Sequence, residues 1–398
     1  MNRNSGQYLR SSTSPEPFLA FVPSPLPPAP PLEITFTIQQ LLEQANRALG
    51  RLDGIGTLLP DMRLFLYSYI RKEALLSSQI EGTQSSFSDL LLYESKEAPG
   101  VPLDDVQEVS NYVAAMEYGL QRIADGFPLS LLLICELHAI LFSGARGSHK
   151  SPGEFRRSQN WIGGSRPGNA RYVPPPPEKL MECLGALEKF WHDDPAPTPT
   201  LIKAALAHVQ FESIHPFLDG NGRVGRLLIT LLLCAEGAIA QPLLYLSLYL
   251  KTNREAYYDH LQQIRDTGDW EEWLCFFLEG VLETANGAAQ TTQAILQIFA
   301  EDRCRIETLG RSASSALRVF GQLQAGPLLT ITKAAEVLHL SVPTVITAVQ
   351  NLEELDIIQE LTGRPRKRLY VYRRYLDILN EGAESLRQHQ LKNESLIL

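Results

Sequence analysis

The sequence predicts a mainly α-helical protein with one short β-hairpin and a winged helix-turn-helix at its C-terminal end. Three observations support this prediction. Apolar residues recur at helical spacing over most of the chain. A section rich in glycine and proline, residues 147–177, interrupts the helical pattern. After residue 326, two short helical patterns are followed by two extended stretches, an order typical of winged helices.

The N-terminal segment, residues 1–33, is rich in proline and includes Pro-Ser-Pro-Leu-Pro-Pro-Ala-Pro-Pro at residues 23–31. Repeated proline excludes a helix or a central strand, so we expect polyproline II or irregular chain. Such a segment could be a ligand for an SH3-type domain, but a strap or a disordered tail is the simpler interpretation.

Residues 34–105 are expected to form an N-terminal helical region. One apolar stripe at helical spacing contains Ile38, Leu41, Leu42, Ala45, Leu49 and Leu52. A second helix is predicted over 61–80. It is expected to end near Gly82, because glycine commonly follows the last turn of a helix.

Residues 106–285 are expected to form the main domain. Two or three helices are expected between residues 106 and 192, interrupted by the section 147–177, in which two short extended arms flank a glycine-rich tip. We interpret this section as a hairpin-like flap and as the main strand element before the C-terminal domain. Helices are then expected over 200–212 and 222–236. The apolar stretch 227–250 is interrupted by Glu236, Gly237, Gln241 and Pro242, which favours a buried helix over a membrane span.

A helical connector, residues 286–325, is expected to lead to a C-terminal domain, residues 326–398. Its predicted elements are helices over 332–338 and 342–355, with Ser341 as N-cap, and extended stretches over 357–361 and 369–372. Six Lys or Arg and no acid lie between Thr362 and Arg374. This basic wing suggests DNA binding, but a packing or dimerisation module is an equal alternative, and the residues do not decide between them.

Composition excludes some classes of protein. The net charge of −9 excludes a protein that coats nucleic acid over its whole surface. Five cysteines stand singly without a C-x-x-C pair, which is typical of reduced cysteines in a cytoplasmic protein. No signal peptide is visible, because residues 1–10 are polar.

The stretch from His215 to Arg226 has the residues that phosphate transfer needs. An imidazole can remove a proton near neutral pH, and the Asp219 carboxylate can hold a hard divalent cation. The Gly-Asn-Gly turn at 220–222 precedes an apolar helix, where backbone N–H groups and the helix dipole favour an anion. Arg223 and Arg226, three apart, share one helix face and can bind further phosphate oxygens.

This stretch reads H-x-F-x-D-G-N-G-R-x-x-R, and with it the sequence resembles the Fic family over about residues 35–285. Two further motifs support the resemblance. Pro152–Gly164 is similar to the segment that leads into the family's flap, and Ser77–Gly82 is similar to its inhibitory S/T-x-x-x-E-G/N motif. The resemblance implies a Fic-type helical bundle. It also implies a protein adenylyltransferase, which transfers AMP from ATP to a Tyr, Thr or Ser hydroxyl of a target protein or of itself and releases pyrophosphate.

The resemblance assigns roles within the motif. His215 would be the general base, neutral at cytosolic pH with a pKa near 6.5. Asp219 would hold Mg²⁺ between the α- and β-phosphates. Arg223 would reach the β-phosphate and Arg226 the γ-phosphate, while Phe217 would anchor the loop in the core. The implied nucleotide-binding residues are Gly220, Asn221 and Gly222 as the anion hole, with Arg223, Val224, Gly225, Arg226 and Tyr258.

The inhibitory motif implies a switch. Glu81, in the same motif as Ser77, would pair with Arg226, withdraw that guanidinium from the γ-phosphate and repel the phosphate. A desolvated pair is worth a few kcal/mol, so we expect its removal to change activity by about a hundredfold or more.

Three further residues follow from the resemblance. Ile162 and Gly163 in the flap would align a target segment as an added strand. The pair Tyr257-Tyr258 resembles the family's adenine-side aromatics, and we expect only one of the two to line the pocket. Arg265 stands where some relatives have Asn, which leaves the ribose contacts unassigned.

Other functions stay open at this stage. The chain could transfer UMP or another nucleotide, or could remove AMP with Glu81 activating water. Kinase or phosphocholine chemistry is disfavoured, because the Gly-Asn-Gly-Arg stretch and the flap look standard. A nucleotide-sensing regulator that binds DNA is the alternative from a different class. A homodimer is consistent with the apolar helical surfaces.

Overall fold

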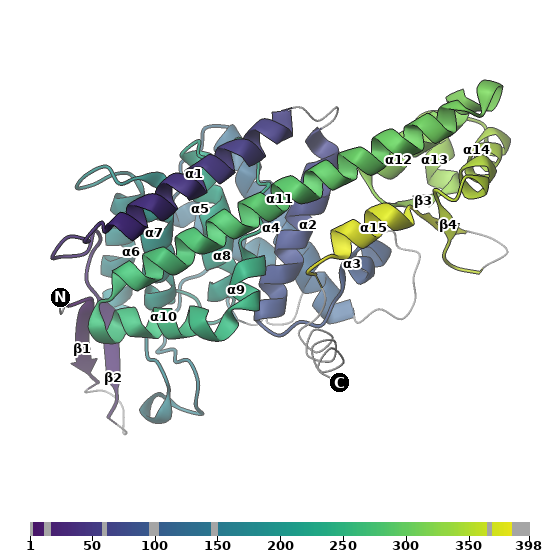
Figure 1. Ribbon diagram of the computed structural model, residues 1–398. Coiled ribbons are helices and arrows are strands. Elements are labelled where there is room, and N and C mark those ends of the chain that lie inside the picture. Colours follow the sequence, from purple (N-terminus) through teal and green to yellow (C-terminus); the bar gives the residue numbers. More distant parts are fainter. Residues whose placement is uncertain are drawn as a thin grey trace, which may run out of the picture.

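Helices dominate the structure, as the helical spacing of the sequence predicts (Figure 1). The computed structural model describes residues 3–11, 17–57, 62–94, 103–144, 150–363 and 368–383. Short strands occur only near the two ends of this described chain: a hairpin at the N-terminal end and a three-stranded sheet at the C-terminal end.

The α-helices have the following bounds: α1 Phe36–Thr57, α2 Met62–Ile80, α3 Phe87–Glu94, α4 Leu103–Ala124, α5 Leu131–Leu141, α6 Pro177–Trp191, α7 Thr200–Ile214, α8 Asn221–Ala235, α9 Ser247–Thr252, α10 Arg254–Thr267, α11 Trp270–Glu307, α12 Ala313–Ala325, α13 Ile331–Leu338, α14 Val342–Glu354 and α15 Arg373–Asn380. The strands are β1 Gly6–Arg10, β2 Leu19–Pro23, β3 Leu328–Thr330, β4 Gln359–Glu360 and β5 Leu369–Val371.

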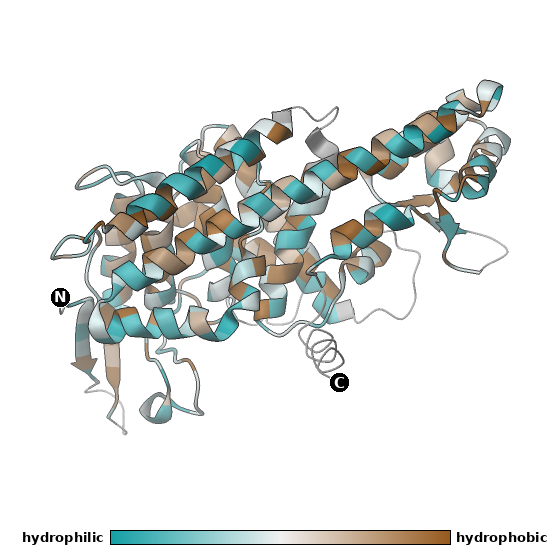
Figure 2. Cartoon of the chain, in the orientation of Figure 1, coloured by the Kyte–Doolittle hydropathy of each residue, from teal (hydrophilic) through white to brown (hydrophobic). Residues whose placement is uncertain are grey.

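Helix α7 lies at the centre of the helical bundle. Every residue from Leu201 to Ile214 is buried, so this helix has no solvent face. Such a helix has to be covered on all sides, and it packs against α6, α8, α10, α11 and β2. Helices at the surface have two faces instead, and Figure 2 shows hydrophilic and hydrophobic residues alternating along α1 and α11. The buried α7 provides a rigid base for the loop that follows it.

Helix α11 connects the bundle to the C-terminal part of the molecule. It has 38 residues, packs along α1 at its first half, and continues without a break past residue 285, where we expected a domain boundary (Figure 1). The helical connector predicted over 286–325 is therefore the second half of α11 together with α12. A continuous helix of this length places the C-terminal elements beside α2 and α3, where α12 and α15 pack.

The proline-rich stretch is irregular after Pro23, as expected, but the N-terminal segment also contains two strands that we did not predict. β1 and β2 form an antiparallel hairpin, with Tyr8 opposite Phe21. Phe21 is buried against Tyr8 and Tyr172, and its N–H donates to the Val173 carbonyl at 2.8 Å. The apolar run Leu19–Val22 directly precedes the prolines and forms β2. It contains a β-branched and an aromatic residue, which favour strands. The hairpin, and not the flap, is the main strand element before the C-terminal elements.

The C-terminal elements follow the predicted order. α13 and α14 are joined by a turn at His339, and the Ser341 side chain accepts from the Thr344 N–H as the predicted N-cap. β3 and β4 pair antiparallel with β5. The most basic part of the expected wing, residues 364–367, and the tail, residues 384–398, lie outside the described residues. The winged-helix interpretation and its partner therefore remain predictions.

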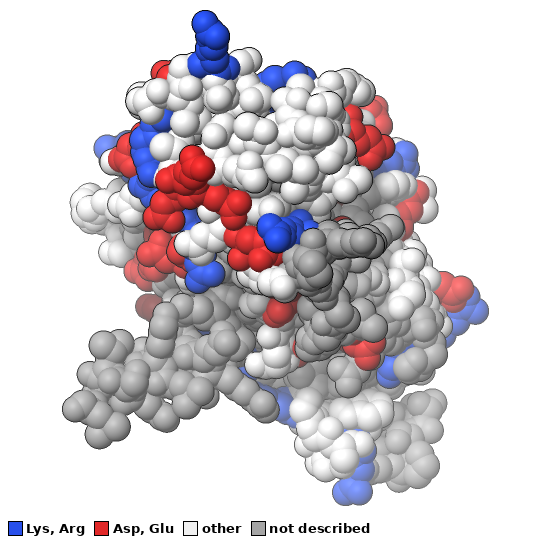
Figure 3. Space-filling view, turned by 90° about the vertical axis from the view of Figure 1, so that its right-hand side faces the viewer, with Lys and Arg blue, Asp and Glu red and all other residues white. Residues whose placement is uncertain are grey.

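The face of the molecule at this end does not show one continuous basic field among its described residues. In Figure 3, acidic side chains gather between scattered basic ones. Across the part of the chain that the structure describes, we also find no helix with the length and apolar character needed to cross a membrane.

The last described residues, α15 and Ala383, return to α2, the helix that leads into the Ser77–Gly82 motif. Tyr375 of α15 lies 3.0 Å from the Ser68 hydroxyl, and Gln79 donates to the Ala383 carbonyl at 3.1 Å. Both side chains of α2 are buried. The Ser77–Gly82 motif is thus fixed between the bundle and the last described residues.

Candidate active site

The loop between α7 and α8 forms the floor of the site. α7 ends at His215, whose backbone is left-handed with φ 49° and ψ 62°, a conformation that costs energy for a residue with a side chain. Asn221 fixes the loop from the other side: its side chain accepts from the Phe217 N–H and donates to the Phe217 carbonyl, both at 2.8 Å. Gly220, with φ 73°, turns the chain into α8. The loop therefore positions His215 at the end of one helix and the N–H groups of 221–223 at the start of the next.

Phe217 anchors this loop, as predicted. It is fully buried and stacks on the His138 imidazole with ring centroids 3.8 Å apart. His138 Nε2 lies 3.1 Å from the Asp219 carbonyl, and Nδ1 accepts from the Gly153 N–H at 2.9 Å. Burial lowers the pKa of His138 to about 4, so this imidazole is neutral and acts as a structural support.

Arg156 connects the flap to the His215 loop. Its buried guanidinium donates to the carbonyls of His215 at 2.9 Å and Pro175 at 2.6 Å. The backbone N–H of Arg156 donates to the Pro216 carbonyl at 2.9 Å. A planar guanidinium is suited to joining carbonyls of separate segments. Arg156 thereby stabilises the strained backbone at His215.

The His215 side chain is a candidate general base held in its neutral form. Burial, together with the Arg156 and Arg265 guanidiniums, lowers the pKa of His215 to about 3. Our expectation of a pKa near 6.5 was therefore wrong, although the conclusion that the imidazole is neutral at cytosolic pH stands. Nδ1 of this residue is buried without a hydrogen-bond partner among the described residues.

Asp219 is an exposed carboxylate beside the first N–H groups of α8. Its Oδ1 accepts from the Gly220 N–H at 2.7 Å. Within the described residues no three His, Cys, Asp or Glu side chains cluster as a metal cage would require. A single carboxylate next to an anion site fits Mg²⁺ that arrives with a triphosphate, because Mg²⁺ in such sites takes one or two carboxylates together with phosphate oxygens and water.

Arg226 is held by the Ser77–Gly82 motif. Its guanidinium donates to Ser77 Oγ at 2.9 Å, to the Ser77 carbonyl at 3.1 Å and to Glu81 Oε1 at 2.6 Å. The Arg226 side chain is 1% exposed and that of Glu81 38% exposed. Burial favours the neutral form of Glu81, but the adjacent guanidinium outweighs burial and lowers the pKa of the carboxyl. The pair predicted from the sequence is thus formed, with one partner open to water.

Gly222 makes this pairing sterically possible. A Cβ at position 222 would overlap Glu81 Oε1 and crowd the Arg226 guanidinium. The Glu81 carboxylate therefore lies directly over the first turn of α8, where an anion would bind. The carboxylate occupies that space as well as neutralising Arg226.

Arg223 has a partner that we did not predict. Its Nη1 lies 3.0 Å from Glu108 Oε2 of α4, and both side chains are largely buried. The Arg223 guanidinium also lies over the Phe142 ring at 5.1 Å. A phosphate at this position would therefore meet a guanidinium that is already oriented by a carboxylate.

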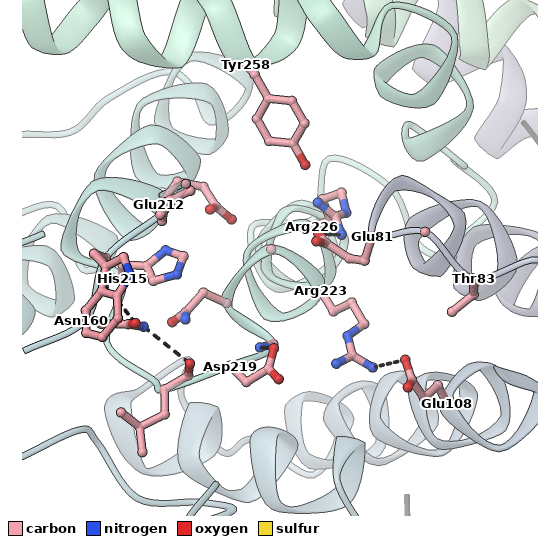
Figure 4. A pocket seen from close by; sticks show the side chains of 18 of the residues that line it. Glu81, Thr83, Glu108, Asn160, Glu212, His215, Asp219, Arg223, Arg226 and Tyr258 are labelled. Atoms are coloured by element: carbon pink, nitrogen blue, oxygen red, sulfur yellow. Dashed lines mark hydrogen bonds and ion pairs between the residues drawn. The ribbon is translucent and has the colours of Figure 1, made fainter. Parts of the chain in front are cut away.

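Tyr257, Tyr258 and Glu212 form the wall opposite Asp219. Tyr257 is buried and its hydroxyl lies 2.9 Å from His208 Nε2. Tyr258 is less buried, and the Arg254 guanidinium lies 5.1 Å from its ring centroid. Both rings contribute to the lining of the cavity, whereas we expected only one. Glu212, between these rings and His215, was not predicted at all (Figure 4).

The flap is less regular than predicted. Ile162 and Tyr172 form one antiparallel bridge, and Gly163 and Gly164 turn the tip with positive φ. Asn160 fixes the base of the flap, since its amide donates to the carbonyls of Phe217 and Leu218. Ile162 and Gly163 do lie at the rim of the cavity.

The predicted residues largely meet in one cavity of about 520 Å³. It is lined by Glu81, Ile162, Gly163, His215, Asp219, Gly220, Asn221, Gly222, Arg223, Arg226 and Tyr258 from the sequence prediction. Val224 and Gly225 do not line it, because Val224 is buried in the core and Gly225 packs against Phe211 and Glu212. Ser77 is not among the residues that line the cavity; it contacts the site through its hydrogen bonds with Arg226. Figure 4 shows Glu81 reaching Arg226 on the side of the cavity away from His215.

The site residues that we did not predict differ in how readily the sequence could have indicated them. Arg156 stands inside the quoted segment 152–164, and Glu212 precedes His215 by three residues on the same helix face. Either position could have been questioned from the sequence. Glu108 and His138 come from distant helices, and no local pattern relates them to the motif.

Comparison with known proteins gives matches over this part of the chain. Residues 39–121 match the family model described as Fic/DOC family N-terminal, and residues 128–233 match the Fic/DOC family model. The chain is 28% identical over 184 residues to Protein adenylyltransferase Fic of Drosophila melanogaster and 31% identical over 207 residues to that of Aedes aegypti. These alignments cover 45% and 50% of this chain but 34% and 38% of the relatives, so the chain matches little more than a third of their length.

A solved structure shares the fold. A Fic family protein from Desulfovibrio desulfuricans aligns with a TM-score of 0.57 over 86% of this chain and 98% of that chain, at 21% identity. The helical arrangement is therefore common to both chains.

Proposed function

From the N-terminal and central domains of the Fic/DOC family that this chain carries, we propose that it is a protein adenylyltransferase held inactive by Glu81. The observation that supports this most strongly is the cavity itself. It combines a neutral, half-buried imidazole, an exposed carboxylate and the N-terminus of α8 with a guanidinium already bound by Glu81.

The proposed reaction is attack of a target hydroxyl on the α-phosphorus of ATP. The hydroxyl oxygen forms a bond to phosphorus, the bond to the bridging oxygen of the β-phosphate breaks, and pyrophosphate leaves. His215 takes the hydroxyl proton, which its neutral imidazole can accept. The N–H groups of 221–223 stabilise the charge that develops on the α-phosphoryl oxygens.

Arg223, oriented by Glu108, and Arg226, once free of Glu81, neutralise the departing pyrophosphate. Asp219 is the residue that would hold Mg²⁺. When bound, the ion would neutralise phosphate charge and orient the triphosphate.

The flap supplies the place for the target. Ile162 pairs with Tyr172 on one side only, and the tip is glycine-rich, so backbone groups at the rim can pair with an extended segment. A hydroxyl carried by such a segment would enter the cavity beside His215.

The experiment is incubation of the purified chain and of Glu81→Ala with Mg²⁺ and ATP labelled on either the α- or the γ-phosphate. Adenylylation predicts that the chain retains the α label and not the γ label, and that mass spectrometry finds AMP on Tyr, Thr or Ser. Retention of γ label would instead indicate a kinase. Labelled UTP in place of ATP tests transfer of UMP.

Removal of AMP is a second candidate, favoured by the position of Glu81 inside the cavity. Water would attack the phosphorus of the AMP group on the modified protein, and Glu81 would take the water proton. The target oxygen would leave with a proton from the imidazolium form of His215, which a proton from solvent supplies beforehand, and Glu81 would return its proton to solvent. Release of labelled AMP from modified protein by the unchanged chain, and its loss in Glu81→Gln, is the expected result for this activity.

A further inference from the structure

One buried carboxyl in the cavity has no role in the reaction above. Glu212 is 7% exposed, lines the cavity, and its Oε1 has no hydrogen-bond partner among the described residues. A buried polar atom without a partner is costly, so its retention calls for an explanation. Burial raises the pKa of this carboxyl to about 7, with Arg226 acting in the opposite direction.

The position of the carboxyl is defined by α8. Its Oε1 lies so close to Gly225 that a Cβ there would overlap it. Gly225 follows Gly222 by three residues, which places it roughly 4.5 Å further along the helix from the anion site. In Figure 4 the Glu212 carboxyl lies between the His215 imidazole and the Tyr258 ring.

The chemistry of ATP limits what can meet this atom. In its ionised form, which predominates above pH 7, the Glu212 carboxylate accepts hydrogen bonds, and phosphate groups offer none and would repel it. The donors that a nucleoside triphosphate has are the ribose hydroxyls and the exocyclic amino group of the base. The ribose is joined directly to the α-phosphate, whereas the amino group lies at the far end of the base, where the Tyr258 ring offers a stacking surface.

We infer that Glu212 is a specificity-determining residue that accepts a hydrogen bond from a ribose hydroxyl of the nucleotide. The inference rests on the proposed function for the placement of the α-phosphate over α8. It predicts that this chain prefers ribonucleotides to deoxynucleotides. Glu212 would supply the ribose contact, since the Arg265 guanidinium lies over the Tyr172 ring, 3.7 Å from its centroid.

The test compares nucleotide binding by the full chain in a Glu81→Ala background, which leaves the cavity open. Calorimetry measures the Kd of ATP, 2′-deoxyATP, 3′-deoxyATP and ITP for the parent, Glu212→Gln and Glu212→Ala. A hydrogen bond to a charged acceptor predicts that one deoxy nucleotide binds the parent about ten- to hundredfold more weakly than ATP. That ratio should fall to a few-fold in Glu212→Gln, whose amide is a neutral acceptor, and to about one in Glu212→Ala.

Controls separate a contact from a structural effect. Asp105→Asn changes another carboxylate that lines the same cavity and should keep the parent ratio. If Glu212→Ala does not fold, the parent and Glu212→Gln still decide the question, since glutamine has nearly the same shape. Equal ratios in the parent and both variants would overturn the inference. A ratio that depends on Glu212 for ITP but for neither deoxy nucleotide would also overturn it, in favour of a contact with the base.

AMP transfer measured in parallel distinguishes this inference from the proposed function. Discrimination of deoxy nucleotides that depends on Glu212, without any transfer, refutes the adenylyltransferase and keeps the ribose contact. Transfer with no dependence of the ratio on Glu212 does the reverse. Absence of nucleotide binding in every variant refutes both.

Discussion

Removal of the Glu81 carboxylate should activate the chain. The Arg226 side chain is 1% exposed and its guanidinium donates three hydrogen bonds, one of them to Glu81 Oε1 at 2.6 Å. While Glu81 stays there, its Oε1 lies over Gly222, where the phosphate would bind. Under the proposed function, activity of the unchanged chain is limited to the fraction of molecules in which Glu81 has moved away.

The structure sets the size of the effect. A hydrogen bond between charged groups contributes about 1.5–3 kcal/mol. Because the Glu81 side chain is 38% exposed, water screens the pair and the value has to be reduced towards that of surface pairs, to about 1–2 kcal/mol. This energy corresponds to about five- to thirtyfold in population, which is below the hundredfold expected from the sequence, where we had assumed a fully desolvated pair.

The assay is incorporation of AMP from α-labelled ATP into the chain, measured as an initial rate. Glu81→Ala and Glu81→Gly should both incorporate about five- to thirtyfold more than the parent, and their agreement would exclude an effect of glycine on the end of α2. Glu81→Gln, which keeps an uncharged acceptor, should fall between. Equal initial rates in the parent and Glu81→Ala would refute this reasoning, provided that His215→Ala abolishes the signal in both.

Three other predictions follow from the site. Because desolvation lowers the pKa of His215 to about 3, its ring signals, assigned by comparison with His215→Ala, should not titrate between pH 5 and 8 by NMR; a midpoint near 6.5 would contradict a base that is neutral throughout this range. Arg156→Ala should lower kcat/KM by about tenfold or more, since two carbonyls that fix the His215 loop lose their donor, whereas Arg157→Ala, whose side chain is 87% exposed, should have no measurable effect. Glu108→Ala should lower the free energy of unfolding by about 3 kcal/mol in urea, because Arg223 is left as a buried unpaired charge; Glu117→Ala on the same helix, 54% exposed and 3.7 Å from its partner, is the control, and equal losses would show that burial of the pair does not matter.

Much of the active-site loop could be predicted from the sequence, because its signals are local. Gly220 marks the turn into α8, and the hydroxyl of Ser341 marks the start of α14; both depend on a few adjacent residues. The pair of Glu81 and Arg226 is not local, being separated by 145 residues, and was accessible only through the family resemblance.

What could not be predicted depends on long-range packing. The partner of Arg223, Glu108, lies on α4, 115 residues away in the sequence. No local sequence pattern around either residue predicts this pair. The pKa of His215 depends on how deeply α7 is buried, which no single-residue reference value contains. The hairpin of β1 and β2 was missed for a different reason: prolines dominate the composition of that segment, while the short apolar run beside them forms the strand.

The absence of a side chain at Gly222 limits which substitutions this site can accept. The same empty volume admits the Glu81 carboxylate in one state and a phosphate in the other, so even one added methyl group would exclude both occupants together. Under the proposed function, a substitution at position 222 would therefore weaken restraint and substrate binding together. A change in restraint alone would instead come from Ser77 on α2 or from Glu81 directly after it, where a residue can be exchanged without reshaping the space that the nucleotide needs.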